Sequence, residues 1–467
     1  MQNQNEQCQF GKTHFIGIGG AGMSGLAKIL LEKGIPVSGS DCNYSPVVAS
    51  LEIMGAQCFI GHQKENITDD IVLLVYSSAI RQDNPEIIAA KEKGIEVVCR
   101  AELLSRLMAL QTGISIAGTH GKSTTTGMLS TILLNAGWEP TVVGGAYLPQ
   151  IQGNAQMGKG DYLIAESDES DGSFLLLHPK IAVITNVEAD HLDHYGTYEK
   201  VVEGFAAFLA QLPEDGLAVI NLDSPGVQEV LAKVSPQNMI TYSIESDLGN
   251  IRAENISYQG RGSSFTCIYQ GEILGEVFLS VPGIYNVSNA LAVIAVAKHI
   301  GISWREILMG LDAFQGVGRR FEILGSVDGI TVVDDYAHHP TEIKATLAAA
   351  KNMGYKRIIA VFQPHRYSRT QALFTDFTDS FLDSDELILN SIYAASEEPI
   401  PGITSKRLAE AIQEKYHRQV DYYDTHEEIL EDLLQRVKAN DLVIMIGAGN
   451  LRQIGVKLVA ALEAGGK

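Results

Sequence analysis

Ile114-Ser-Ile-Ala-Gly118-Thr-His-Gly-Lys122-Ser-Thr-Thr-Thr126 is a short apolar run that breaks into a glycine loop and then a Lys-Ser-Thr segment. This pattern predicts a buried strand, a tight loop and the first turn of a helix. Loop N–H groups and a helix N-terminus point at a bound phosphate, Lys122 adds a positive charge, and the Ser123 hydroxyl can ligate Mg²⁺. We therefore predict a nucleotide phosphate site in this stretch.

The loop is a shortened form of the general phosphate-loop pattern. That pattern carries a glycine six residues before the lysine, where this chain has Ile116. The residues of the loop and the helix start are Gly118, Thr119, His120, Gly121, Lys122, Ser123 and Thr124. The alternative is an ordinary turn from a strand into a helix. The spacing of lysine and hydroxyl after a strand favours phosphate binding.

Length and composition predict several globular domains. At 467 residues the chain exceeds what one hydrophobic core usually supports, and length predicts about three domains. With 45% hydrophobic and 19% charged residues, the chain is typical of folded proteins. The net charge of -21 argues against a general nucleic-acid or anionic-membrane surface. An anionic substrate would then require locally placed Lys, Arg and helix N-termini.

Cysteine usage and the N-terminus predict a soluble cytoplasmic protein. The five cysteines are scattered and form no Cys-x-x-Cys pair: Cys8, Cys42, Cys58, Cys99 and Cys267. This arrangement predicts neither a disulfide framework nor a zinc site. Residues 1–6 lack the charged and apolar regions of a secretory signal, and no apolar run approaches ~18 residues.

A second glycine pattern opens the chain. The apolar run 13–18 is followed by Gly17-x-Gly19-x-x-Gly22, with Gly20 and Ala21 inside the pattern, and by an amphipathic helix to Gly34. Asp41 lies about twenty residues further on, where a carboxylate could bond a ribose hydroxyl. Any diphosphate can sit on such a helix N-terminus, so NAD and another diphosphate nucleotide both remain open.

Further apolar runs at 71–76 and 94–98 predict two more strands of this first sheet. Ser77 and Ser78 follow the first of them, where hydroxyls would point into the binding crevice of the sheet. The alternative is a helix cap before Pro85-Glu86.

Two acidic clusters follow predicted strands in the middle of the chain. The run 162–165 ends in Glu166-Ser-Asp-Glu-Ser-Asp171, and the run 181–185 ends in Asn186-Val-Glu-Ala-Asp-His191. Because the carboxyl ends of neighbouring parallel strands meet near the phosphate loop, Ser123, Glu166 and His191 form a candidate metal set. The remaining acids of the first cluster fit a solvated loop equally well. Gly144-Gly145 predicts a turn, and residues 216–282 predict a small antiparallel extension.

Strand–helix alternation resumes in the last third of the chain, with apolar runs at 330–333, 357–362, 386–389 and 442–446. Polar clusters follow these runs and include His338, Arg366 and Arg369. Arginine binds carboxylates bidentately, so Arg366 and Arg369 suit a carboxylate substrate, while Arg319 could reach a phosphate. Surface salt bridging explains any single arginine equally well. Gly447-Ala-Gly449 predicts a turn that leads into a helix.

Five co-linear motifs together resemble the Mur ligases, at residues 118–123, 166–171, 185–193, 334–340 and 362–369. The resemblance covers nearly the whole chain and implies an α/β fold of three domains. Residues 1–109 would form a Rossmann-like domain that binds a UDP substrate rather than NAD. Residues 110–317 would form a central P-loop-type ATPase domain with the antiparallel extension. Residues 318–467 would form a Rossmann-like domain that admits an amino acid.

The resemblance also implies residue roles. Lys122 would contact the ATP phosphates, with Ser123 and Glu166 on Mg²⁺ and His191 on a second Mg²⁺. Asn286 and Asn289 would lie near the adenine, Arg319 near the γ-phosphate, and His338, Arg366 and Arg369 near the amino acid. The UDP substrate would meet Gly19, Gly20, Ala21, Gly22, Asp41, Ser77, Ser78 and Asn186. Tyr285 stands where the family commonly has histidine beside the adenine.

The activity implied by the resemblance is ATP-dependent joining of L-alanine to UDP-N-acetylmuramate in peptidoglycan precursor synthesis, through an acyl phosphate. The protein would act as a monomer or weak homodimer, without nucleic-acid or membrane partners. The nearest alternative is a recycling ligase that joins a tripeptide to the same nucleotide. An NAD-dependent dehydrogenase and a non-catalytic ATP-driven binding module are alternatives of other classes. His338 is a candidate base for the alanine amine on side-chain chemistry.

Overall fold

The computed structural model describes residues 10–465, so Cys8 and the N-terminal residues 1–6 lie outside the described part. The chain divides into two compact units. One comprises residues up to 254 with 267–275 and 288–314, and the other comprises 255–266, 276–287 and the residues from 315 onward. Among residues 10–465, no helix is long and apolar enough to cross a membrane.

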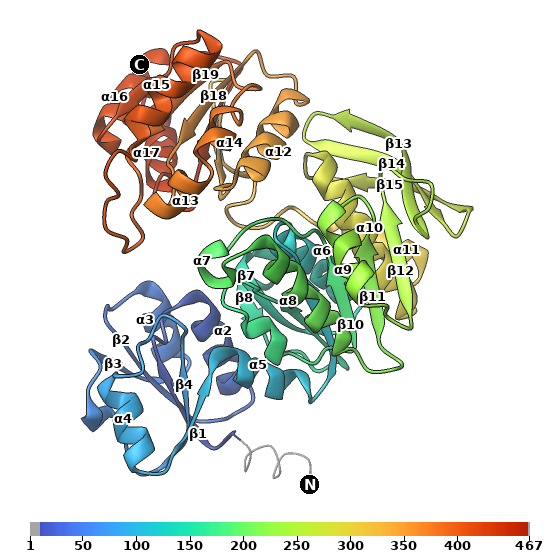
Figure 1. Cartoon of the computed structure of the whole chain (residues 1–467), viewed down its shortest axis with the longest axis vertical. Coiled ribbons are helices and arrows are strands. Elements are labelled where there is room, and N and C mark those ends of the chain that lie inside the picture. The colour runs from blue at the N-terminus through green and yellow to red at the C-terminus, as the bar shows by residue number, and fades with distance from the viewer. Residues whose placement is uncertain (1–9, 466–467) are drawn as a thin grey trace. The chain divides into compact units, whose positions relative to one another are not determined.

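The first sheet is parallel and has five strands in the order β3-β2-β1-β4-β5 (Figure 1). Its strands are β1 (Lys12–Ile16), β2 (Val37–Asp41), β3 (Gln57–Ile60), β4 (Ile71–Tyr76) and β5 (Glu96–Cys99). Its helices are α2 (Ala21–Glu32), α3 (Pro46–Ile53), α4 (Pro85–Glu92) and α5 (Arg100–Met108), with a short 3₁₀ turn η1 (Lys64–Asn66). The strand order reverses at β1, which confirms the predicted Rossmann-like arrangement and places a crevice beyond the carboxyl ends of β1 and β4.

The second sheet has ten strands in the order β15-β14-β13-β12-β11-β10-β6-β9-β7-β8. Its strands are β6 (Thr112–Ala117), β7 (Thr141–Leu148), β8 (Gly153–Gln156), β9 (Tyr162–Glu166), β10 (Ile181–Ile184), β11 (Leu217–Asn221), β12 (Met239–Ser243), β13 (Ile251–Gln259), β14 (Gly262–Tyr269) and β15 (Glu272–Leu279). The strands from β13 to β7 pair in parallel, whereas β8 runs antiparallel to β7.

The second sheet is accompanied by six α-helices and two 3₁₀ turns in the described residues. These are α6 (Lys122–Asn135), α7 (Leu192–Tyr195), α8 (Tyr198–Ala210), α9 (Pro225–Lys233), α10 (Ile284–His299), α11 (Trp304–Ala313), η2 (Pro149–Ile151) and η3 (Ser173–Leu176). On one face, an apolar cluster packs α8 against β10 and β11, with Phe205 and Phe208 fully buried. Strands β6, β10 and β11 are buried along almost their whole length, which is why they read as continuous apolar runs.

The third sheet has six strands in the order β16-β17-β21-β18-β19-β20. Its strands are β16 (Glu322–Val327), β17 (Ile330–Asp335), β18 (Arg357–Phe362), β19 (Glu386–Asn390), β20 (Asp421–Tyr423) and β21 (Asp441–Ile446). Its helices are α12 (Pro340–Lys351), α13 (Tyr367–Ala372), α14 (Phe374–Thr378), α15 (Ser405–Tyr416), α16 (His426–Arg436) and α17 (Arg452–Glu463). Five strands are parallel and β16 is antiparallel to β17. Separate apolar clusters cover its two faces.

Two local predictions were wrong. Gly144 and Gly145 lie inside β7 and do not form a turn. The segment from residue 216 is not an extension at its start, because β11 and β12 continue the parallel sheet with a fully buried β11. The additional strands begin only at β13. The predicted α/β class with three sheet-forming regions is confirmed, while the boundaries at 109 and 317 remain predictions.

Candidate active site

The predicted phosphate loop connects β6 to α6 and requires glycine at two positions. Gly118 has φ of +135° and Gly121, the N-cap of α6, has φ of +84°. A Cβ on Gly118 would collide with the Thr185 hydroxyl, and one on Gly121 would lie 2.8 Å from the Asn289 side-chain oxygen. The strand, loop and helix therefore form as predicted, and Asn289 lies against the loop.

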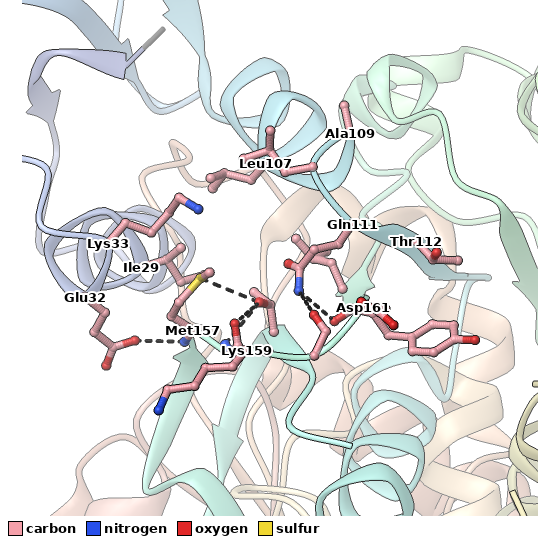
Figure 2. Close-up of a pocket in the computed structure, with 16 residues that line it drawn as sticks. Ile29, Glu32, Lys33, Leu107, Ala109, Gln111, Thr112, Met157, Lys159 and Asp161 are labelled. Carbon is pink, nitrogen blue, oxygen red and sulfur yellow. Dashed lines mark hydrogen bonds between the residues drawn. The ribbon is translucent and has the colours of Figure 1, made fainter. Parts of the chain in front are cut away.

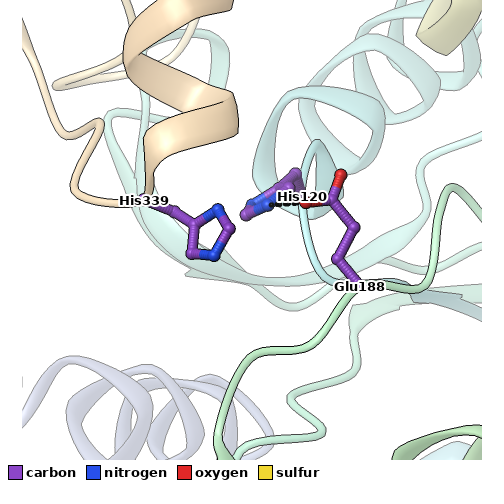
Figure 3. A group of neighbouring side chains, drawn as sticks. All are labelled: His120, Glu188 and His339. Atoms are coloured by element: carbon purple, nitrogen blue, oxygen red, sulfur yellow. Dashed lines mark ion pairs between the residues drawn. The ribbon is translucent and has the colours of Figure 1, made fainter. Parts of the chain in front are cut away.

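Residues that follow β10 hold the loop in place. The His120 N–H donates to the Asn186 side-chain oxygen (2.8 Å), and the Asn186 amide donates back to the His120 carbonyl (3.0 Å). The Glu188 N–H donates to the Thr119 hydroxyl (2.9 Å). His120 Nε2 lies 3.5 Å from Glu188 Oε2. Figure 3 shows the His120 ring beside the Glu188 side chain. Asn186, predicted on the UDP side, thus hydrogen-bonds to the phosphate loop.

Lys122 is a buried ammonium paired with Glu169. Its Nζ lies 2.9 Å from Glu169 Oε2 and donates to the Gly118 carbonyl at 2.6 Å. The two side chains are 13% and 2% exposed, so the pair is screened little by solvent. Burial alone would lower the pKa of Lys122, but the Glu169 carboxylate raises it above its ordinary value. Lys122 therefore carries a full positive charge inside the loop.

Ser123 and Glu166 meet as predicted. The Ser123 hydroxyl donates to Glu166 Oε1 at 3.0 Å, and the Gly145 N–H donates to Glu166 Oε2 at 2.8 Å. A Cβ on Gly145 would lie 2.6 Å from Glu166 Oε1, so the carboxylate needs glycine at that point of β7. A hydroxyl and a carboxylate this close, beside a phosphate loop, fit the oxygen ligands that Mg²⁺ prefers. Thr124, next along α6, is buried.

His191 joins the same cluster through Glu169. Its Nε2 lies 3.6 Å from Glu169 Oε1 and 3.7 Å from Asp190 Oδ2. Glu169 thus connects Lys122 to His191, a role that the sequence prediction did not assign. The acidic run after β9 was the available signal, but which of its carboxylates is buried depends on the tertiary fold.

The first-sheet residues predicted for the UDP substrate gather at the carboxyl ends of β1, β2 and β4. The Gly19 N–H donates to Asp41 Oδ2 at 2.9 Å, and Gly20 is the N-cap of α2, which begins with Ala21 and Gly22. A Cβ on Gly17 would lie 3.8 Å from the Cβ of Ser77, and Ser78 is exposed. The capping alternative for the two serines is wrong, because the Asn84 side chain caps α4 by accepting from Glu86 N at 2.9 Å.

In the second unit, Arg319 lies against strand ends of the third sheet. Its Nε donates to Asp334 Oδ2 (3.1 Å), and its Nη2 donates to the carbonyls of Gly447 (2.9 Å) and Gly449 (3.1 Å). Its guanidinium lies 4.8 Å from the Tyr336 ring centre. Residues 447–449 form the predicted turn before α17. Asn286, near the start of α10, donates to the Pro282 carbonyl at 2.7 Å.

The residues predicted to bind the amino acid substrate also lie close together in this unit. The His338 ring lies 6.2 Å from the His365 ring, and Arg369 Nη1 lies 3.2 Å from His365 Nδ1. Arg366 precedes α13 with φ of +71°. Burial, with Arg369 and Arg366 nearby, lowers the pKa of His365 to about 4, so the ring is neutral and Nδ1 accepts from Arg369. His365 was absent from the predicted site, although it lies in the same motif.

A groove of about 1230 Å³ lies away from this chemistry, at the amino ends of β6 and β9 (Figure 2). The Gln111 amide donates to the Gly160 carbonyl at 2.6 Å, and the Met157 N–H donates to Glu32 Oε2 at 2.8 Å. The first bond joins Gln111, between α5 and β6, to the loop between β8 and β9, and the second joins that loop to the end of α2. The phosphate loop lies at the opposite, carboxyl end of β6.

Family comparison covers the three sheet regions in order. Residues 12–112 match "Mur ligase family, catalytic domain", residues 116–297 match "Mur ligase middle domain", and residues 319–449 match "Mur ligase, glutamate ligase domain".

Individual relatives extend over almost the whole chain. The UDP-N-acetylmuramate--L-alanine ligase of Geotalea uraniireducens is 48% identical over 452 residues, 97% of this chain and 98% of its own length. The enzyme of the same name from Geobacter sulfurreducens is 47% identical over 455 residues, with the same coverage of both chains.

Solved structures of similar ligases also superpose on almost the whole chain. The UDP-N-acetylmuramate-alanine ligase of Thermotoga maritima superposes with a TM-score of 0.82 at 28% identity, over 97% of this chain and all of its own. A murein peptide ligase of Psychrobacter arcticus superposes with a TM-score of 0.71 at 26% identity, over 97% and 98%.

Proposed function

The chain belongs to the Mur ligase family, and we infer that it is the member that joins L-alanine to UDP-N-acetylmuramate at the expense of ATP. The observation that carries this function is the 48% identity to a ligase of that name over 97% of the chain. The protein is an ATP-dependent enzyme that forms an amide bond. A phosphate loop with a charged lysine, next to a hydroxyl–carboxylate pair, supports this chemistry.

The proposed reaction has two steps. A carboxylate oxygen of UDP-N-acetylmuramate attacks the γ-phosphorus of ATP, forming an acyl phosphate and releasing ADP. The amine of L-alanine then attacks the acyl carbon, and phosphate leaves from the tetrahedral intermediate as the amine loses a proton. Negative charge gathers between two anionic reactants in the first step, so positive charge held in place should lower that barrier most.

Residues of the second sheet would supply much of this charge. Lys122 would move from Glu169 to the ATP phosphates, and the loop N–H groups with the α6 N-terminus would hold the same anion. Ser123 and Glu166 would hold Mg²⁺ and His191 a second ion, because these side chains offer the oxygen and imidazole ligands described above. Bound Mg²⁺ would neutralise phosphate charge during transfer. Asn286 and Asn289 would lie near the adenine, as in the family resemblance.

The remaining roles belong to the first and third sheets. Gly19 to Gly22 and Asp41, with Ser77 and Ser78, would bind the UDP substrate. Arg366 and Arg369 would bind the alanine carboxylate, with Arg319 near the γ-phosphate. His338 would take the proton from the amine. We further propose that the protein works in the cytoplasm as a monomer or weak homodimer, without nucleic-acid or membrane partners.

The test of this function offers alternative acceptors to the purified protein. With ATP, Mg²⁺ and UDP-N-acetylmuramate present, L-alanine should release phosphate in step with amide formation, whereas the tripeptide L-Ala-γ-D-Glu-meso-diaminopimelate should not. Faster phosphate release with the tripeptide would instead identify the recycling ligase. ADP formation without amide product would identify an uncoupled ATP-driven module, and NADH binding to the first sheet would favour a dehydrogenase.

A further inference from the structure

A buried carboxylate anchors a polar cluster beneath the end of β2. The Glu86 side chain is fully buried. It accepts from the Ser40 hydroxyl (2.6 Å), the Asn66 amide (2.5 Å) and the Gln63 N–H (3.2 Å). His14 Nε2 lies 3.4 Å away. Burial alone would raise the pKa of Glu86, but hydrogen bonds from His14, Ser40 and Asn66 hold it below its ordinary value, so the group is a carboxylate.

This carboxylate fixes the protonation pattern of His62. Ser40 has one hydroxyl proton and donates it to Glu86, so its oxygen accepts from His62 Nδ1–H, 2.9 Å away. In this tautomer the lone pair of the His62 ring lies on Nε2. That nitrogen lies 3.4 Å from Cys42 Sγ. Cys42, His62, Ser40 and Glu86 therefore form a proton relay in which His62 can accept the thiol proton.

The thiol of this relay stands beside the glycine loop of the first sheet. Cys42 is exposed and directly follows Asp41, whose carboxylate accepts from Gly19 N. We propose that Cys42 is a nucleophilic thiol, deprotonated by His62, at which peroxides oxidise the protein and block the binding of the UDP substrate. The blocking part of this proposal rests on the proposed function, which places that substrate at Asp41 and the glycines.

The proposed oxidation balances with one equivalent of hydrogen peroxide. The Cys42 proton passes to His62 Nε2, and the thiolate sulfur attacks one peroxide oxygen. An S–O bond forms as the O–O bond breaks, and the departing hydroxide takes the proton from His62 to leave as water. The sulfur is oxidised by two electrons to a sulfenic acid, and the peroxide is reduced to water.

Other cysteines in the described residues provide internal comparisons. Burial raises the pKa of Cys58 to about 11 and that of Cys267 to about 12. Both therefore remain thiols at neutral pH and should react slowly. Cys42 differs from them in being exposed and in facing an imidazole nitrogen.

Alkylation by iodoacetamide tests the thiol without any substrate. In the full-length protein carrying Cys8→Ser, labelling at pH 7 is followed by intact mass and peptide mapping, with glutathione as the reference thiol. Because His62 Nε2 lies within reach of the Cys42 thiol proton, we expect Cys42 to react at least about tenfold faster than glutathione. His62→Gln and, independently, Ser40→Ala should each slow Cys42 several-fold. A rate for Cys42 in the protein with native His62 no faster than glutathione would overturn the proposal.

Binding of UDP-N-acetylmuramate tests the consequence of oxidation. The nucleotide should protect Cys42 from alkylation, and treatment with peroxide should weaken its binding at least tenfold by calorimetry. Cys42→Ser should bind normally and resist peroxide. Unchanged binding after Cys42 has been oxidised would overturn the blocking step. Failure of the proposed ligase function would show separately, as absent amide formation by untreated protein.

Discussion

Lys122 is a side chain that would pair with two different anions in turn. In the structure its ammonium is paired with the buried Glu169, and in the proposed reaction it pairs with ATP phosphate. Because both partners are negative, the lysine remains charged throughout and needs no proton transfer when nucleotide arrives. Glu169 therefore acts as a positioning residue that keeps Lys122 in the loop.

Removing the lysine should abolish ligation. Lys122→Ala deletes the only loop side chain that brings a positive charge to the phosphates, so we expect amide formation to fall by at least about 10²–10³-fold. The measurement is phosphate release and product formation with L-alanine. Lys159→Ala, at an exposed position in the distant groove, is the matched control and should keep normal activity. Near-normal turnover of Lys122→Ala would remove this loop from the mechanism.

Removing the charge of its partner should cost stability. Glu169→Gln removes the carboxylate that directly contacts the buried Lys122 ammonium and leaves Asp168 and Glu166 as its remaining negative neighbours. We expect the free energy of unfolding without nucleotide to fall by about 3 kcal/mol. Denaturant unfolding measures the change. Glu203→Gln, which breaks the exposed pair with Lys233, should change stability by less than about 0.5 kcal/mol. Equal effects of the two substitutions would show that Glu169 is not a buried counter-ion.

His365 predicts a pH dependence of stability. In the folded protein the pKa of His365 is about 4, below the ordinary value of 6.5. Between these pH values, His365 is therefore protonated in the unfolded chain but not in the folded one. This contribution to stability is present above pH 6.5 and is lost as pH falls towards 4. Because the ring is only partly buried, we expect an effect of about 1–2 kcal/mol.

Unfolding measured between pH 4 and 7.5 checks this dependence. His365→Gln should flatten the fall in stability relative to the parent protein. His299→Gln, at an exposed position on α10, should leave the profile unchanged. Parallel profiles for the parent and His365→Gln would contradict the assignment.

Elements with continuous burial were predictable from sequence, and others were not. Strands β4 and β18 match the apolar runs 71–76 and 357–362, because buried parallel strands require such runs. Strand β3 was missed because its residues are exposed or half-buried, and β7 because its glycine pair resembles a turn. The Ser123–Glu166 pair was predictable because the carboxyl ends of neighbouring parallel strands meet near the phosphate loop. The Lys122–Glu169 pair did not, since sequence does not say which acid of a cluster is buried.

The loop between β6 and α6 predicts a sharp glycine requirement. A side chain at Gly118 would adopt φ of +135° and meet the Thr185 hydroxyl and the Asn186 backbone, so Gly118→Ala should distort the loop. We expect the affinity for ATP, measured by calorimetry, to fall at least about tenfold, because such strain costs about 1–3 kcal/mol. The control variant is Gly137→Ala. Gly137 lies just beyond the other end of α6, and a Cβ added there would meet nothing within 4 Å. It should cost about 1 kcal/mol of stability and leave ATP binding intact.

At the scale of the whole molecule, the side chains and loops proposed to act in the reaction come from all three sheets. The glycine loop of the first would hold the nucleotide sugar, the second carries the phosphate loop, and the third carries Arg366 and Arg369. An acyl phosphate reacts with water, so we propose that the domain that would admit the amino acid also excludes water from the intermediate while alanine attacks it. On this proposal, the domains move relative to one another during the catalytic cycle.

This requirement predicts a ligand-dependent change in overall dimensions. UDP-N-acetylmuramate together with a non-hydrolysable ATP analogue and Mg²⁺ should decrease the radius of gyration measured by small-angle X-ray scattering, because closure brings the arginine-bearing domain to the reacting groups. Lys122→Ala is the control, since without the nucleotide contact it should bind UDP-N-acetylmuramate but remain unchanged in size. Calorimetry should confirm that both ligands are bound to the parent protein. A constant radius of gyration with both ligands bound would contradict protection of the acyl phosphate by domain closure. Protection from water would then have to come from residues around the phosphate loop itself.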